Sequence, residues 1–172
     1  IEPSGRREQE SIRRLGKEIY PKISVPLILT SQVEPGFTRS LHLPIYHMAE
    51  TLRIKDAEFR ALHPDYIVIG GPQPLPPSIM RFAGYFMCPL IACSWEDAEF
   101  SKIAVNMTLA SQVENTNRLA NAAKKIGANW SKVAEIIGKD RRIGPYSYLT
   151  PGNWKKSQHL LRDHFTLNNI NG

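Results

Sequence analysis

The sequence predicts an α/β fold in which a parallel sheet is followed by an all-helical part, with one long helix joining the two. Two observations predict it. Three short apolar runs in the first half are separated by helical or turn-like segments, as in a parallel sheet covered on both faces. The second half shows only helical periodicity. The pattern changes from short apolar runs to helical periodicity near Ser94 and Trp95, so we predict two domains, residues 1–95 and 96–172.

Length and composition indicate an ordinary globular protein. The chain has 172 residues, of which 42% are hydrophobic and 22% charged, enough to bury a core and unlike a disordered or fibrous sequence. The net charge of +6 favours polyanionic partners, but basic clusters lack a recognisable module or interleaved aromatic residues, so we expect no nucleic-acid partner. The two cysteines, Cys88 and Cys93, are predicted to be reduced and buried.

No leader and no membrane-spanning run is visible in the sequence. There is no charged segment followed by an apolar one at its start, and no uninterrupted apolar run is long enough to cross a bilayer. We therefore expect a cytoplasmic protein without a membrane partner. Cysteine and histidine spacings of metal sites are also missing, and we expect no metal.

The first half contains three predicted strands. VPLILTS (Val25 to Ser31), Tyr66 to Ile69, and Pro89 to Cys93 are short apolar runs bounded by turn residues. Helices are expected at Glu8 to Ile19, which is amphipathic, and at Pro76 to Phe86, where prolines stand in the first turn. The polar stretch that follows the turn Glu34 to Gly36 has moderate helical character.

The second half is predicted to contain three helices. Apolar residues recur every three or four positions from Glu96 to a terminating Gly127, which predicts one long helix. Its apolar stripe comprises Phe100, Ile103, Met107, Ala110, Val113, Leu119, Ala123 and Ile126. Asn129 is placed to cap a second helix, Trp130 to Ile137, and a third is expected at Lys155 to Phe165 after the loop PYSYLTPGN.

Three pairs of polar residues could carry chemistry. Lys102 and Asn106 are one helical turn apart, so they could together donate hydrogen bonds to a developing oxyanion. His159 and Asp163 have the same spacing, which allows an orienting hydrogen bond. Glu50 and Arg53 have helical spacing too. Spacing alone favours a solvent-facing polar pair for Lys102 with Asn106 and a surface pair for His159 with Asp163, and Glu50 with Arg53 could be an ordinary helical ion pair.

Taken in order, these positions resemble the UDP-glucose/GDP-mannose dehydrogenase family. LTSQVEPGFTR resembles the family's turn that borders the dinucleotide, and HMAETLRIKDAEFRALHPDYIVIGG the stretch that carries a catalytic glutamate. DAEFSKIAVNMTLASQVENTNRLA is similar to the helix that opens the family's central domain and supplies a lysine and an asparagine. GKDRRIGPYSYLTPG matches a Gly-x-Asp-x-Arg-Ile-Gly segment and a Pro-Gly loop.

The resemblance implies a fold, a reaction and a set of site residues. Residues 1–95 would be the C-terminal part of a Rossmann-like NAD-binding domain, and residues 96–172 the helical dimerisation domain of a homodimer. The family oxidises the C6 alcohol of a UDP- or GDP-sugar to a carboxylate, with NAD as cofactor. The catalytic residues would be Lys102, Asn106, Asp163, Glu50 and His159. Thr30 and Ser31 would border NAD, and the sugar nucleotide would be bound by Glu50, Leu52, Arg53, Lys102, Asn106, Tyr148 and Gly152.

The chain departs from the family at the catalytic cysteine. An ungapped register from Leu149 to Asp163 puts His159 at the cysteine position and Arg162 at a lysine position, and it replaces two glycines by Lys156 and Ser157. Imidazole is a poorer nucleophile than a thiolate, so the thioester step is predicted to be impaired. The sequence also lacks the GxGxxG pyrophosphate turn. The alternative is a non-catalytic dimeric scaffold or a nucleotide-sugar-binding protein.

Overall fold

The computed structural model describes residues 6–49 and 57–172. The chain forms two compact units, Ile1–Ile103 and Ala104–Gly172. The first unit is α/β and the second is helical, which confirms the predicted fold class. Whether the functional domains divide near residue 95, as the sequence predicts, stays a prediction.

A four-stranded, mostly parallel sheet forms the centre of the first unit. Its strands lie in chain order and comprise β1 (Leu27–Leu29), β2 (Ile45–Met48), β3 (Ile67–Gly70) and β4 (Leu90–Cys93). β1 pairs with β2 and β3 pairs with β4 in parallel, whereas β2 and β3 are antiparallel. Three of the four strands were predicted. The carboxyl ends of β1 and β2 therefore meet the amino ends of β3 and β4 at one edge of the sheet.

Strand β2 corrects the prediction of helical character between Gly36 and His63. Only two short helices form in the described part of that stretch, α2 (Phe37–Ser40) and α3 (Ala57–Leu62), and β2 lies between them. Three of the four residues of β2 are buried, including His47, whose polar side chain disguises the strand in the sequence. Burial between two neighbouring strands decides the conformation here, since four residues carry little periodic signal of their own.

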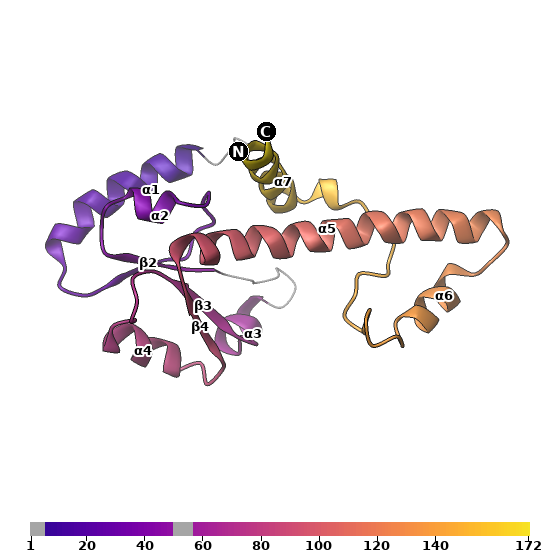
Figure 1. The fold of residues 1–172 in the computed structure, drawn as a ribbon, viewed down its shortest axis with the longest axis horizontal. Coiled ribbons are helices and arrows are strands. Elements are labelled where there is room, and N and C mark those ends of the chain that lie inside the picture. Colours follow the sequence, from indigo (N-terminus) through magenta and orange to yellow (C-terminus); the bar gives the residue numbers. More distant parts are fainter. Residues whose placement is uncertain (1–5, 50–56) are drawn as a thin grey trace. The chain divides into compact units, whose positions relative to one another are not determined.

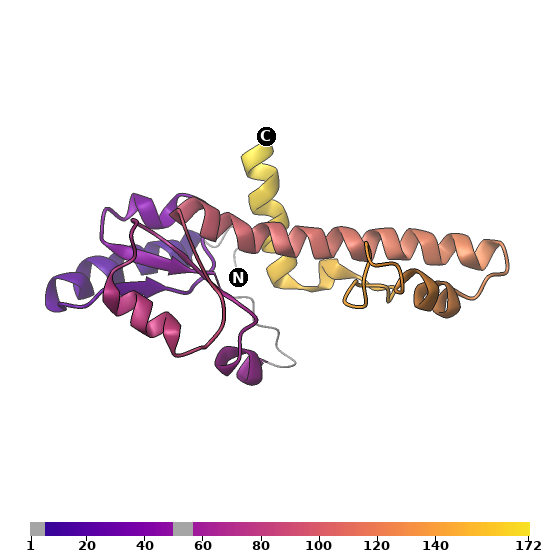
Figure 2. The same ribbon diagram turned by 60° about the horizontal axis from the view of Figure 1, so that its bottom comes forward.

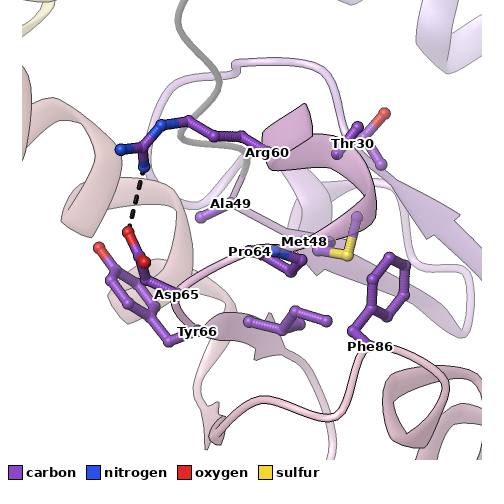
Figure 3. A pocket seen from close by; sticks show the side chains of 10 residues that line it. Thr30, Met48, Ala49, Arg60, Pro64, Asp65, Tyr66 and Phe86 are labelled. Carbon is purple, nitrogen blue, oxygen red and sulfur yellow. Dashed lines mark hydrogen bonds and ion pairs between the residues drawn. The ribbon is translucent and has the colours of Figure 1, made fainter. Parts of the chain in front are cut away.

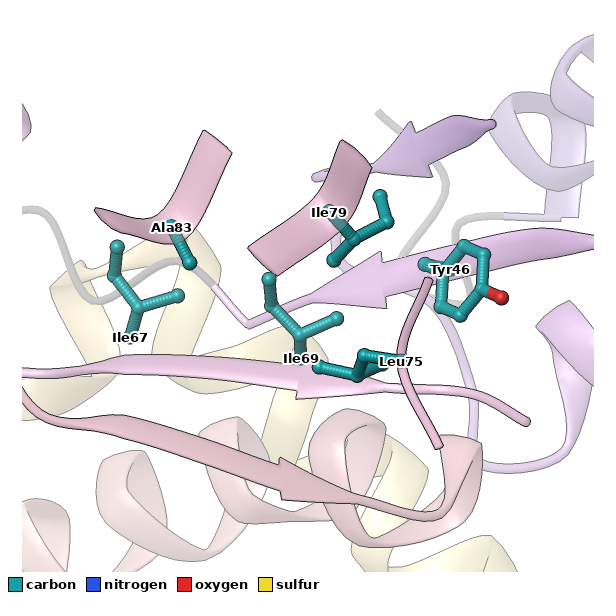
Figure 4. Packing of buried hydrophobic residues seen from close by; sticks show 6 residues of the cluster. All are labelled: Tyr46, Ile67, Ile69, Leu75, Ile79 and Ala83. Atoms are coloured by element: carbon teal, nitrogen blue, oxygen red, sulfur yellow. The ribbon is translucent and has the colours of Figure 1, made fainter. Parts of the chain in front are cut away.

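Helices cover the two faces of this sheet (Figure 1). On one face, α1 (Arg6–Ile19), which continues into the 3-10 turn Tyr20–Lys22, and α2 cover a cluster formed by Val33, Phe37, Leu41 and Ile45. On the other face, Ile79 and Ala83 of α4 (Pro77–Gly84) pack on Ile67 and Ile69 of β3 (Figure 4). The predicted helices at Glu8 to Ile19 and Pro76 to Phe86 are confirmed. The core of the unit is thus two apolar layers around one short sheet.

The long helix α5 (Trp95–Lys125) begins in the first unit and continues into the second. In the second unit the chain reverses after α5, and α6 (Trp130–Ile137) lies beside its C-terminal part (Figure 2). The predicted cap is confirmed, because Asn129 accepts a hydrogen bond from the Ser131 amide. A 3-10 turn (Trp154–Lys156) precedes α7 (Gln158–Asn171). At 31 residues α5 is long, yet no helix in the described ranges is also apolar enough to cross a membrane.

The buried stripe of α5 differs from the predicted apolar stripe. Ile103, Ala110 and Ala123 are buried as expected, but Ile126 is 81% exposed. Phe100 and Leu119 are each 40% exposed. Polar residues take buried positions instead, namely Glu99, Asn106 and Thr116. Their side chains have hydrogen-bond partners, which offset the free-energy cost of removing them from water.

The contact between β3 and the start of α5 predicts the effect of Gly70→Ala. A Cβ at Gly70 would lie 2.5 Å from the Ser94 carbonyl oxygen and 2.6 Å from the Ala98 Cβ, so the helix start has to move. We expect a loss of about 1 to 3 kcal/mol of unfolding free energy in urea titrations. Gly84→Ala at the end of α4 is the matched control, because its Cβ meets nothing within 4 Å. Equal stability of both variants would contradict the packing described here.

Candidate functional site

The turn after β1 carries the residues predicted to border a dinucleotide. Thr30 and Ser31 follow the carboxyl end of β1 and are both exposed. Parallel α/β sheets bind ligands beyond the carboxyl ends of their strands, so this position suits a ligand contact. The chain then passes Gly36, whose φ of 87° is left-handed and favours glycine, and enters α2.

A buried carboxylate from α5 holds this turn. Glu99 is fully buried, and its Oε2 accepts a hydrogen bond of 2.6 Å from the Gly36 amide. Its Oε1 accepts a bond of 2.8 Å from the amide of Thr38. Burial raises the pKa of Glu99, while these two amides favour the charged form. The turn is thereby tied to a residue more than 60 positions away in the sequence.

A pocket of about 250 Å³ opens at the end of the sheet where β1 and β2 finish and β3 begins (Figure 3). It is lined by Thr30, Met48, Ala49, Arg60, Ala61, Pro64, Asp65, Tyr66, Ile67 and Phe86. Most of these side chains are apolar. An ion pair of 3.1 Å between Arg60 and Asp65 lies at one side of the pocket in Figure 3. Of the two predicted cofactor residues, only Thr30 reaches it.

His47 is an unpaired polar group in the core of the first unit. It is 1% exposed, and burial lowers its pKa to about 4. Its register partner on β3 is Gly70, whose open side is covered by Ala98 of α5, so His47 faces the same helix. Within the described ranges, neither His47 Nδ1 nor the hydroxyl of Thr38 has a hydrogen-bond partner. His47 is therefore neutral at physiological pH.

In the second unit, the asparagine and the aspartate of the predicted catalytic set are joined. The Nδ2 of Asn106 donates a hydrogen bond of 2.6 Å to Oδ2 of Asp163 on α7. Asp163 is 1% exposed and also accepts from Nε of Arg162 at 3.1 Å. Lys102, half-buried and engaged in its own contacts, precedes Asn106 by one turn of α5. Both residues lie on α5, and Asn106 is buried and not solvent-facing.

His159 lies apart from this pair. It is exposed in the first turn of α7, and in the described part of the chain no hydrogen bond joins it to Asp163. The hypothesis of an orienting His159–Asp163 bond is therefore wrong. The preceding turn is built around Trp154, which is buried, donates to Oε1 of Glu114 at 2.8 Å and packs edge-on against His164.

Side chains of α5 hold the loop that carries Tyr148 and Gly152. The amide side chain of Asn117 accepts from the Gly152 N–H at 2.9 Å and donates to the Gly152 carbonyl at 2.7 Å. The hydroxyl of Thr116 donates to the Tyr148 carbonyl at 2.7 Å, and Gln112 accepts from the Tyr148 amide at 3.0 Å. This loop is shaped by backbone contacts to the helix.

Comparison with known proteins bears on these residues directly. Residues 96–164, which include Lys102, Asn106, His159 and Asp163, match the model of the UDP-glucose/GDP-mannose dehydrogenase family, central domain. The UDP-glucose 6-dehydrogenase YwqF of Bacillus subtilis is 32% identical over 131 residues, covering 73% of this chain and 30% of YwqF. The chain belongs to the UDP-glucose/GDP-mannose dehydrogenase family.

Other relatives agree over more of the chain. The UDP-glucose 6-dehydrogenase of Rickettsia bellii is 29% identical over 158 residues, covering 90% of this chain and 35% of that protein. The chain thus spans about a third of the length of these curated relatives. A solved UDP-glucose dehydrogenase from Pyrobaculum islandicum superposes with a TM-score of 0.76 at 23% identity, over 96% of this chain and 43% of that one. At this identity the superposition shows the shared dehydrogenase fold.

Part of the predicted site lies outside the described residues, and part of the observed site was not predicted. Glu50, Leu52 and Arg53 fall in residues 50–56, which the structure does not describe. The sequence reasoning missed Glu99 and Asn117, two of the side chains that hold loops of this dehydrogenase family member. A signal was available, because both fall on the helix face that also carries Asn106, at intervals of seven and eleven residues.

The buried His47 predicts a pH dependence of stability. Since its folded pKa of about 4 lies below the ordinary 6.5, the unfolded chain binds more protons between these values, and stability falls as pH falls from 6.5 to 4. The loss is roughly 3 kcal/mol. Glu99 acts in the opposite sense because its pKa is raised, so the test compares denaturant unfolding of wild type with His47→Leu at both pH values. If the unfolding free energy of His47→Leu falls between the two pH values as much as that of wild type, His47 is not the cause.

The Asn106–Asp163 bond predicts a rescue by exchange. Asp163→Asn removes the acceptor charge and Asn106→Asp sets two carboxylates together, so each change should cost about 1 to 3 kcal/mol of unfolding free energy. The double variant restores one amide and one carboxylate in reversed order. At pH 7 we expect the double variant to lose less unfolding free energy than the two single losses added together. It should remain less stable than wild type because Arg162 no longer meets a charge. Additive losses in urea titrations would show that the two residues do not interact.

Proposed function

We propose that this chain is part of a nucleotide-sugar dehydrogenase whose family reaction is the NAD-dependent oxidation of the C6 alcohol of a UDP- or GDP-sugar, and in which the thioester step is impaired. The observation that carries the proposal is the buried bond between Asn106 and Asp163. Both residues stand where the family resemblance puts catalytic side chains. A buried, exactly paired polar couple is costly to keep for packing alone.

The residues of this chain suit one border of an NAD site. NAD supplies a hydride acceptor when bound. Thr30 and Ser31 offer exposed hydroxyls beyond the carboxyl end of β1, and the Thr30 side chain opens onto the pocket in Figure 3. We propose that these two residues border the cofactor, and that the turn held by Glu99 keeps them in place.

On the substrate side, we propose that Lys102 and Asn106 donate hydrogen bonds to the C6 oxygen of the sugar, whose hydroxyl proton would pass to water while the hydride on C6 would pass to NAD. Asp163 would hold a water for the second oxidation, with Glu50 bordering the sugar. Tyr148 and Gly152 would contact the nucleotide sugar from a loop that Asn117 and Thr116 hold to α5. The basic side chains Lys155 and Lys156 suit the diphosphate, being exposed and adjacent.

The second oxidation is the step that we propose to be impaired. A cysteine at position 159 would add to the aldehyde and hold it as a hemithioacetal, which a second hydride loss converts to a thioester. The imidazole of His159 forms a short-lived adduct instead. It is also exposed at the start of α7 and has no described partner that would orient it as a base. The product of this protein would therefore be the aldehyde.

A homodimer through the second unit is part of the proposal. Large apolar side chains remain exposed there, and they are Val105, Leu119, Ile126, Ile136, Ile143, Tyr146, Tyr148, Phe165 and Ile170. Against these, the buried apolar residues described in the unit are Ala110, Ala123 and Trp154. Such an imbalance is typical of a surface that another copy covers.

The second candidate function is a non-catalytic dimer that scaffolds or binds a nucleotide sugar. Two observations favour it. The amide donor of Asn106 is already engaged by Asp163, and the position of the nucleophile holds an exposed histidine. In this case binding of the sugar nucleotide would persist without turnover.

A turnover assay separates the two candidates. We expect the full-length gene product to form NADH with at least one member of a panel of UDP- and GDP-sugars. Lys102→Ala should lower kcat by about a hundredfold, because a pre-organised donor is lost. Lys132→Ala is the matched control, since Lys132 is 75% exposed and pairs with Glu135 on the surface. NADH formation by wild type that disappears in Lys102→Ala excludes the scaffold, whereas a silent wild type supports it.

Restoring the thiol tests the impaired step. If His159 is the cause, wild type releases an aldehyde with one NADH per sugar, and His159→Cys releases the uronic acid with two. Mass spectrometry of the product and the NADH count measure both. Uronic acid from the wild-type protein would show that the second oxidation is intact.

A further inference from the structure

The hydrogen bonds between Glu99 and the segment after β1 are made by a carboxylate that is buried from solvent. Glu99 has no exposed surface, and both of its carboxylate oxygens are used, one by Gly36 N–H and one by Thr38 N–H. Removing a carboxylate from water is costly, and burial accordingly raises the pKa of Glu99. An apolar residue in the same space would leave the Gly36 and Thr38 amides without these acceptors, so the carboxylate fixes the position of both amides.

The two segments that Glu99 connects explain why a fixed position matters. One end of the connection is the turn that follows Thr30 and Ser31 at the carboxyl end of β1, where parallel sheets take their ligands. The other end is the first part of α5, on which Lys102 follows Glu99 by three residues and so lies on the same side of the helix. Both ends belong to the first unit. The Glu99 bonds therefore hold the Gly36 and Thr38 amides, which follow Ser31 by five and seven residues, against the part of α5 that carries Lys102.

A second link between the same elements is of a different kind. Arg39 of α2 forms a two-pronged ion pair with Glu96 of α5, at 2.5 and 2.9 Å, and stacks on Trp95. These side chains are substantially exposed, and Arg39 lowers the pKa of Glu96 to about 2. Solvent screens such a pair, and side chains joined at their tips tolerate small shifts. Among the described residues, Glu99 bonds to the backbone of this segment, whereas Glu96 bonds to the tip of the Arg39 side chain.

We propose that Glu99 is a positioning residue for hydride transfer. It acts through the Gly36 and Thr38 amides to hold Thr30 and Ser31 at the distance from Lys102 that the reaction requires. The proposal rests on the proposed function. It assigns Glu99 no contact with substrate or cofactor.

The test compares Glu99→Gln with Glu96→Gln in the full-length gene product. The first change leaves one amide facing an NH2 group, and the second removes the exposed pair one turn earlier on the same helix. We expect Glu99→Gln to lower kcat by at least about tenfold and to weaken NAD binding in calorimetry, because small displacements of reacting groups are costly. Glu96→Gln should change both less than about twofold. In Glu99→Gln, hydrogen exchange at the Gly36 and Thr38 amides should also accelerate.

A merely structural role for Glu99 predicts a different pattern. It would lower the melting temperature of Glu99→Gln while the folded enzyme keeps its kcat and NAD affinity, and that result would overturn the proposal. If Glu99→Gln does not fold, Glu99→Asp keeps the charge but is one methylene shorter, and wild-type kcat in that variant overturns the proposal equally. A wild-type protein that neither binds NAD nor turns over sinks the proposed function and this proposal with it. An active wild type with an unaffected Glu99→Gln sinks this proposal alone.

Discussion

The carboxylate of Glu99 is the constraint around which the first unit is arranged. Its two amide partners are Gly36, which precedes α2, and Thr38, in the first turn of α2, so the helix that starts after β4 is tied to the connection between β1 and β2. The neighbouring contacts follow from that tie. Trp95 can donate to the Ile45 carbonyl at 2.7 Å, and Ala98 can rest on Gly70 without a side chain between them, only when α5 crosses the sheet at this place. The buried Glu99 bonds therefore act together with the Trp95 and Gly70 contacts in fixing where α5 crosses the sheet.

Hydrogen bonds have the same role in the second unit, where apolar burial is scarce. Few large apolar side chains are buried there among the described residues, whereas Asn106, Thr116, Asp163 and Thr166 are. Asn117 and Thr116 shape the 148–152 loop by holding its backbone, and Trp130 adds a bond of 3.0 Å to the Leu149 carbonyl. Side chain to backbone bonds specify a loop conformation but contribute only about 1 kcal/mol each. A unit built this way keeps its loop geometry precise while relying on further apolar contacts for stability, in line with the proposed dimer.

The sequence predicted the elements that have long periodic patterns and missed those decided by tertiary contacts. Helix α5 and its neighbour α6 were readable because a stripe repeats over many turns and Asn129 stands at a helix start. Strand β2 was not, since four residues carry no usable period and its His47 looks polar although the sheet buries it. In the candidate site, too, some features were predicted from the sequence and others depend on tertiary contacts. Asn106 and Asp163 were indicated by family register, but the exposure of His159 depends on where α7 begins, which no spacing rule determines.

The substitution at position 159 acquires its meaning from what surrounds it. Asp163 is buried, and Asn106 and Arg162 donate hydrogen bonds to its two oxygens. Removal of one partner from such a group costs more than loss of the whole set, so the set also resists piecemeal change. Under the proposed function the first oxidation needs only donors to the alkoxide and a hydride acceptor, whereas the second needs a covalently held aldehyde. Under that proposal Asn106 belongs to the first requirement, whereas Asp163 and the missing thiol belong to the second. Because Asn106 is kept and the thiol is replaced, we assign the impairment to the second step and not to the whole reaction.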